Sequence, residues 1–119
     1  MSMRPDPRVW LFDVVQAAQR AQRFIHGRTY ADYQADELLR AGVERQFEIM
    51  GEALNRLRRE APDLVEAIQD HHQIIGFRNL LIHAYATVDD AIVWSIAQEK
   101  LAPLLADVQA LLARLDGGA

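Results

Sequence analysis

The sequence predicts an all-α protein, an up-and-down bundle of four to five helices. Apolar residues recur every three or four positions along most of the 119 residues, which is the period of a helix face packed on a core. No stretch alternates apolar and polar residues as a strand does, and no repeat or linker divides the chain. We therefore expect one domain over residues 1–119, with an N-terminal arm at 1–6 and a frayed tail at 116–119.

The first helix is predicted from about Pro7 to His26. Asp6 suits the capping position, and Pro7 suits the first helical turn because proline has no N–H to lose there. Gly27 ends the pattern. The apolar stripe of this helix contains Val9, Leu11, Phe12, Val15, Ala18, Phe24 and Ile25.

A short helical stretch and a long second main helix follow. Thr29 is the expected cap of the short stretch, and Asp36 precedes the long helix, which ends before Pro62. The buried face of the long helix is predicted from its spacing to contain Leu39, Val43, Phe47, Met50, Leu54 and Leu57.

Two further helices complete the bundle. Pro62 starts a short helix to about Gln69, a polar turn over residues 69–72 follows, and an apolar helix then ends near Ala84. Asp89 or Asp90 opens the last helix, which Pro103 should kink. Its predicted buried face contains Ile92, Ile96, Leu101, Leu104, Leu105, Val108, Leu111 and Leu115.

The composition restricts the class of protein. The 13 basic and 17 acidic side chains leave a net charge of −4, so the overall field repels nucleic acid, and any RNA contact has to be local. All but one of the basic residues are arginine, which suits bidentate phosphate contacts. The absence of cysteine excludes disulfides and thiolate zinc sites, and no stretch is long enough to span a membrane. We expect a soluble, cytoplasmic protein that does not bind DNA.

The segment from Gly76 to Tyr85 carries polar groups where packing alone favours leucine or alanine. Arg78, Asn79 and His83 stand in an otherwise apolar helix, where a buried charge is costly unless it is paired. Without further information, each has an ordinary structural interpretation. Arg78 then pairs with a carboxylate such as Glu52, His83 is a satisfied core histidine, and Tyr85 packs its ring.

The Arg-x4-His-x-Tyr spacing of this segment resembles the HEPN superfamily and, within it, the HepT toxins that are paired with a minimal nucleotidyltransferase (MNT) antitoxin. Residues 48–53, Glu-Ile-Met-Gly-Glu-Ala, and residues 74–79, Ile-Ile-Gly-Phe-Arg-Asn, are similar to further runs of the family. The resemblance extends to residues 88–94 and covers most of the chain from about Tyr30. One departure is Asp70-His71-His72, where family members often have an apolar-Pro-Trp step.

The resemblance implies a HEPN-type bundle that is the toxin of a type VII-like toxin–antitoxin module. Such a toxin is a metal-independent RNA endonuclease without a cofactor, and its substrate by analogy is tRNA. Arg78 and His83 would be catalytic, with Asn79 and Glu52 in supporting roles. Tyr85 would be the residue that an MNT-type nucleotidyltransferase antitoxin AMPylates. The alternatives are a non-catalytic helical binding partner of a nucleotidyltransferase and a structural dimer whose motif only packs.

Helix geometry bears on how these residues could form one site. At about 100° per residue, Arg78 and Tyr85 share one face, Asn79 and His83 share another, and Arg78 and His83 diverge by about 140°. One straight helix cannot bring that pair together. We therefore predict a two-fold homodimer in which the two copies of the motif helix line a shared cleft.

Three other clusters have ordinary interpretations. Glu44, Glu48 and Glu52 resemble a carboxylate metal site, but the Glu-x-x-His pair of helical di-metal proteins is missing, and flanking Arg40 and Arg56 favour an ion-paired helix face.

His71-His72 is expected to belong to a polar turn, because no third ligand stands at helical spacing. Arg56, Arg58 and Arg59 are expected to be a solvated helix end, with contacts to an RNA backbone as the alternative.

Overall fold

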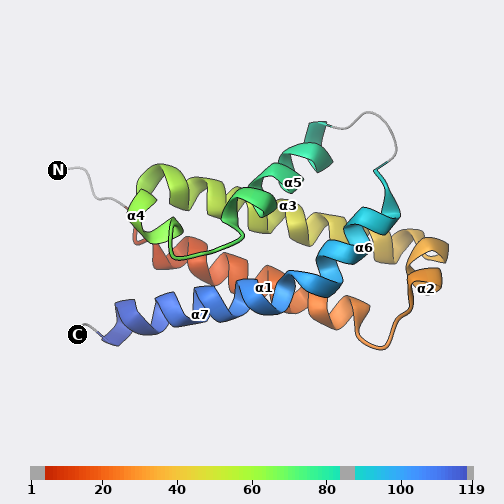
Figure 1. Ribbon diagram of the computed structural model, residues 1–119, viewed down its shortest axis with the longest axis horizontal. Helices are drawn as coiled ribbons and strands as arrows, with labels where there is room; N and C mark the ends of the chain where they lie inside the picture. The colour runs from red at the N-terminus through yellow and green to blue at the C-terminus, as the bar shows by residue number, and fades with distance from the viewer. Residues whose placement is uncertain (1–4, 84–87, 118–119) are drawn as a thin grey trace.

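The structure, a computed structural model, describes residues 5–83 and 88–117 and confirms the predicted all-α bundle (Figure 1). No strand occurs in the described ranges, and no helix there is both long and apolar enough to cross a membrane. The helices are α1 (Arg8–Ile25), α2 (Tyr30–Ala35), α3 (Glu37–Glu60), α4 (Pro62–Val65), α5 (His71–His83), α6 (Asp90–Glu99) and α7 (Leu101–Gly117).

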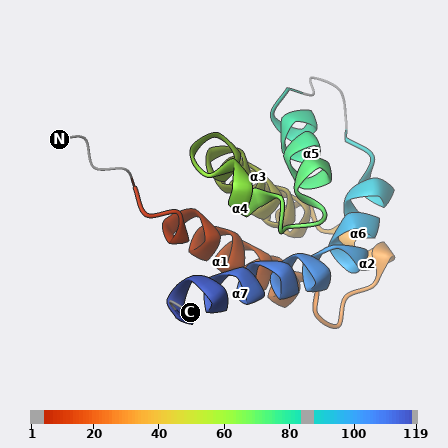
Figure 2. The ribbon, with the colours of Figure 1, turned by 60° about the vertical axis from the view of Figure 1, so that its left-hand side comes forward.

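The long helix α3 is the centre of the bundle. It packs against α1 on one side and against α5 on the other, and α7 lies along α1 (Figures 1 and 2). The start of α1 and the end of α7 meet, because Arg8 Nη1 lies 2.8 Å from Asp116 Oδ1. Helix α7 thus continues to Gly117, past the start of the predicted frayed tail, and residues 1–4 and 118–119 lie outside the described chain.

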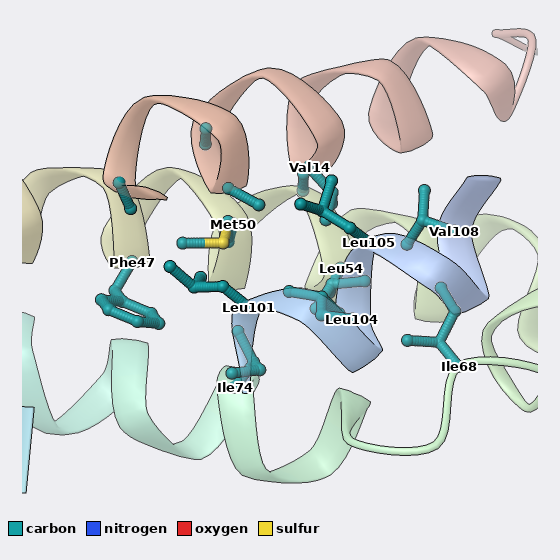
Figure 3. Packing of buried hydrophobic residues seen from close by; sticks show 14 of the residues in the cluster. Val14, Phe47, Met50, Leu54, Ile68, Ile74, Leu101, Leu104, Leu105 and Val108 are labelled. Atoms are coloured by element: carbon teal, nitrogen blue, oxygen red, sulfur yellow. The ribbon is translucent and has the colours of Figure 1, made fainter. Parts of the chain in front are cut away.

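The core lies between these helices, and it confirms the predicted face of α3. Met50 and Leu54 of α3 face Leu101 and Leu104 of α7, and Ile74 joins them from α5 (Figure 3). The buried face of α3 includes every residue that its spacing predicted: Leu39, Val43, Phe47, Met50, Leu54 and Leu57.

The prediction for α1 was partly wrong. Val9, Phe12 and Phe24 keep 53%, 49% and 36% of their surface exposed. Helix α1 touches both α3 and α7, and its buried face is the one between those neighbours. The residues on that face are Trp10, Leu11, Val14, Ala17, Ala18 and Ala21.

The predicted caps are present. Thr29 accepts a hydrogen bond from the Asp32 N–H at 3.1 Å, and Asp32 accepts one in return from the Thr29 N–H, which completes a capping box. Asp36 and Asp89 cap α3 and α6 through their side chains. Asp6 Oδ1 accepts a hydrogen bond from the Arg8 N–H at 3.0 Å, although Pro7 rather than Asp6 is the N-cap residue.

The predicted polar turn at residues 69–72 was wrong in its second half. His71 and His72 open α5, and His71 is only 4% exposed. The Nδ1 of His71 donates to the Ile68 carbonyl at 2.7 Å, so the ring is buried with one nitrogen satisfied. The helix before this turn is also shorter than predicted, since α4 ends at Val65.

The segment that was predicted to form one last helix forms two helices, α6 and α7. The chain breaks at Lys100, before Pro103, because the proline ring cannot tolerate the carbonyl four residues earlier, that of Glu99. The face of the first half also differs from the prediction. Val93 and Ala97 are buried, whereas Ile92 is 49% exposed.

Candidate active site

Helices α3 and α5 approach each other very closely at Gly51. A Cβ at this position would lie 2.1 Å from the Cβ of Arg78 and 2.7 Å from its Cγ, distances that real side chains do not reach. It would also lie 3.2 Å from the Ile74 carbonyl oxygen. The stem of Arg78 therefore lies directly on the backbone of α3, and only glycine leaves the space for it.

The guanidinium of Arg78 is held by two neighbours. Its Nη2 donates to Glu52 Oε2, the residue after Gly51, and its Nη1 donates to Asn79 Oδ1 at 2.9 Å. The Arg78 side chain is 22% exposed and that of Glu52 is 45% exposed, so the pair lies at the surface with the arginine stem covered. The contact that the structural interpretation of Arg78 predicted, an ion pair with Glu52, is present.

Arg78 and Glu52 line a cleft of about 440 Å³ between α1, α3 and α5. Its apolar lining comes from Trp10, Ile49, Ala53 and Ile82. Its charged lining comes from Asp13, Arg45, Glu48, Glu52, Arg56 and Arg78. Three arginines thus balance three carboxylates, and the cleft is formally neutral in a chain whose net charge is −4.

His83 does not line this cleft. It is the last residue of α5, it is exposed, and the helix between Arg78 and His83 is continuous. Five residues turn a regular helix by about 140° and advance it by about 7.5 Å, which separates the two side chains. The structure therefore brings Arg78, Asn79 and Glu52 together and leaves His83 apart, while Tyr85 lies outside the described residues.

Helix α5 is less buried than its apolar sequence predicted. Ile74, Ile75 and Phe77 are buried, but Leu80 is 50% exposed and Ile82 is 40% exposed. The covered half is the half that packs on α3. In the second half, next to His83, the apolar side chains of Leu80 and Ile82 are about half exposed among the described residues.

Of the three carboxylates along α3, Glu48 and Glu52 form ion pairs, with Arg45 and Arg78 rather than with the flanking Arg40 and Arg56. Arg40 lies 4.0 Å from Asp90 of α6 rather than against Glu44, and Arg45 lies 3.8 Å from Glu48. Within residues 5–83 and 88–117, no group of three or more His, Asp or Glu side chains is placed to hold a metal ion.

Glu44 has no ion-pair partner in the described part of the chain, and its environment opposes ionisation. Partial burial raises the pKa of its carboxyl above the ordinary 4.5, and the nearby charges of Asp90 and Glu48 raise it further. The folded state therefore binds this proton more tightly than the unfolded state. The free energy of unfolding falls as the pH rises through the window that begins near 4.5.

We expect Glu44→Gln to raise the melting temperature near pH 7, where the native glutamate is ionised, and to give no gain near pH 4, where it is protonated. Thermal melts across this pH range measure the difference. Glu66→Gln, which removes one charge from an exposed residue outside this group, is the control. An equal gain from Glu44→Gln at both pH values would contradict the assignment.

Of the residues that line the cleft, only Arg78 and Glu52 were among the predicted site residues; Arg45, Trp10 and Asp13 are charged or aromatic residues that were not predicted from the sequence. A signal for Arg45 was present, because Arg45, Glu48, Glu52 and Arg56 stand at helical spacing on one face of α3. No comparable signal marks Trp10 and Asp13. Their place in the cleft depends on how α1 crosses α3, which is a tertiary contact.

Comparison with known proteins gives a consistent result. A family model described as Ribonuclease HepT-like matches residues 14–111, from α1 into α7. A protein of Methanocaldococcus jannaschii that is named as an RNase is 28% identical over 113 residues, covering 92% of this chain and 98% of that protein. A protein of Thermococcus cleftensis named as a probable ribonuclease HepT is 26% identical over 102 residues, covering 86% and 92% of the two chains. No solved structure matches.

Proposed function

Because the chain belongs to the HepT-like ribonuclease family, we propose that this ribonuclease is the toxin of a toxin–antitoxin pair and that Arg78 and His83 form its catalytic site. The observation that carries the site assignment is the placement of Arg78. Gly51 gives its stem room, Glu52 and Asn79 hold its guanidinium, and a cleft of about 440 Å³ opens in front of it. This arrangement supports a phosphate-binding role.

The chemistry we propose uses the RNA's own nucleophile. The ribose 2′-hydroxyl lies next to its phosphorus, so its attack needs positioning more than activation by a metal. His83 takes the proton from this hydroxyl or gives one to the departing 5′-oxygen, and the products are a 2′,3′-cyclic phosphate and a 5′-hydroxyl. Arg78 stabilises the charge on the pentavalent phosphate, and Asn79 orients the guanidinium.

Glu52 has a positioning role in this proposal. Its carboxylate holds Arg78 before RNA binds, and a substrate phosphate then competes with it for the guanidinium. The exchange is feasible because the Glu52 side chain is 45% exposed, and water screens ion pairs at such a surface.

The complete site, in this proposal, is formed by a two-fold homodimer. Two observations support it: Arg78 and His83 diverge on a continuous helix, and the apolar side chains of Leu80 and Ile82 are uncovered near His83. A dimer axis at the second half of α5 would cover these side chains and join the two half-sites. Light scattering at micromolar concentration should give twice the chain mass of 13.5 kDa, and a monomer mass would contradict the shared site.

The experiment that tests the function incubates the purified protein with end-labelled RNA in excess EDTA. We expect discrete products ending in a cyclic phosphate, and we expect them from tRNA before other RNAs of the same length. The absence of any cleavage, together with tight binding to a nucleotidyltransferase, would favour the alternative of a non-catalytic partner.

We further propose that a nucleotidyltransferase antitoxin silences the toxin by transferring AMP to Tyr85, two residues after the last residue of α5. A phosphate added there would place negative charge near His83 and hinder RNA sterically. Tyr85→Phe keeps the ring but removes the acceptor oxygen. The variant should retain toxicity while resisting the antitoxin.

Intact-mass spectrometry after co-expression with such an antitoxin is the measurement. The wild type should gain one or more AMP masses, and Tyr85→Phe should gain none. Tyr30→Phe, at a tyrosine of α2 far away in the sequence, is the matched control and should be modified like the wild type. Undiminished modification of Tyr85→Phe would overturn the assignment.

A further inference from the structure

We infer that Arg56 and Arg45 provide phosphate subsites on either side of Arg78, and that Arg56 is the first anchor for the RNA backbone. The inference rests on the proposed function in one respect, which is that RNA enters the cleft lined by Arg78. The inference specifies which phosphates of the RNA strand the cleft binds, and which of the three arginines binds the RNA first.

The three arginines lie in a row along the cleft. Arg45 and Arg56 are eleven residues apart on α3, which places them within about 20° of the same helix face and about 16 Å apart along the axis. Arg78 lies between them, because its stem rests on Gly51. The row therefore has the length of a few stacked nucleotides of a single strand.

The arginines differ in how free they are to bind an anion. Arg78 is engaged by Glu52, and Arg45 lies 3.8 Å from Glu48. Arg56 is exposed, and no carboxylate lies within 4.0 Å of its guanidinium in the described ranges. A phosphate therefore reaches Arg56 without displacing a carboxylate, whereas at Arg78 and Arg45 it meets a guanidinium that already lies beside a carboxylate.

Position also separates Arg56 from the other arginines at the end of α3. Arg58 donates to Asn55 Oδ1 at 2.6 Å, and neither Arg58 nor Arg59 lines the cleft. The structure thus divides the Arg56, Arg58 and Arg59 cluster that the sequence presented as a single helix end. Arg59 provides a control with the same charge on the same helix end.

The test measures RNA binding in a His83→Ala background, in which the probe is not consumed. A fluorescent single-stranded RNA oligonucleotide of mixed sequence is titrated with protein, and anisotropy is followed over a salt series. We expect Arg56→Gln to raise Kd about three- to tenfold at low salt and to reduce the salt slope by about 0.7, the value of one single-strand phosphate contact. Arg59→Gln should leave both quantities unchanged.

Arg45→Gln should raise Kd less than Arg56→Gln does, because Arg45 starts from an ion pair with Glu48. Equal effects of Arg56→Gln and Arg59→Gln would overturn the inference and leave the proposed function intact, since RNA would still bind. Absence of RNA binding by the His83→Ala parent would overturn both. Circular dichroism of the variants checks that these exposed substitutions leave the fold unchanged.

Discussion

Alanine at position 78 or 83 will slow RNA cleavage by about two to three orders of magnitude and leave the bundle folded. In the proposed mechanism, loss of Arg78 removes the charge that faces the phosphate, and loss of His83 removes the proton carrier. Neither side chain fills the core, because His83 is exposed and only the stem of Arg78 is covered. Single-turnover rates on labelled RNA, with thermal melts in parallel, measure both effects.

Arg78→Lys sharpens this prediction. Lysine keeps the charge and most of the stem but loses the paired donors that contact Glu52 and Asn79 together. We expect a rate between those of the wild type and Arg78→Ala. Variants of Arg78 and His83 that cleave RNA within twofold of the wild-type rate would show that these residues are not catalytic.

Gly51→Ala will lower the stability of the fold, although it adds only one methyl group. The new Cβ would lie 2.1 Å from the Cβ of Arg78, so α3 and α5 have to separate or Arg78 has to leave its place on α3. Overpacking of this kind costs about 1–3 kcal/mol, which exceeds the gain of up to about 1 kcal/mol from replacing a helical glycine. RNA cleavage should fall as well, since the guanidinium moves with its stem.

The chain contains a matched control for this substitution. Gly76 is also helical, on α5, and a Cβ there would meet nothing within 4 Å. Gly76→Ala should therefore raise the free energy of unfolding by up to about 1 kcal/mol, through helix propensity alone. Denaturant titrations of the two variants should give changes of opposite sign. A Gly51→Ala protein as stable as the wild type would contradict the close contact between α3 and α5.

Local sequence signals predicted most helix starts of this fold well, because a helix start depends on residues that are close together in the chain. The caps at Thr29 and Asp36 act within three residues and stand where predicted, and Asp89 is the one of the two predicted residues, Asp89 or Asp90, that caps α6. The buried face of α3 also followed from spacing alone. Because α3 is packed on both sides, the apolar residues at this spacing are buried whichever neighbour they face.

Two of the errors occurred where another part of the bundle determines which residues are buried. Val9 and Phe12 of α1 were predicted to be buried, but α3 and α7 cover a different face of the helix. His71 was assigned to a polar turn by its neighbours, yet the Ile68 carbonyl and the core hold it in α5. In each case a tertiary contact overrode a local preference.

The candidate site divides in the same way. The sequence by itself determined the all-α class, the buried face of α3 and the divergence of Arg78 and His83, because the helical period follows from neighbouring residues. Only the tertiary structure decided that Gly51 seats Arg78 on α3 and that Arg45 and Arg56 share its cleft. These facts depend on the distance and the angle at which α1 and α5 cross α3. Both are determined by the volumes of packed side chains that are far apart in the sequence.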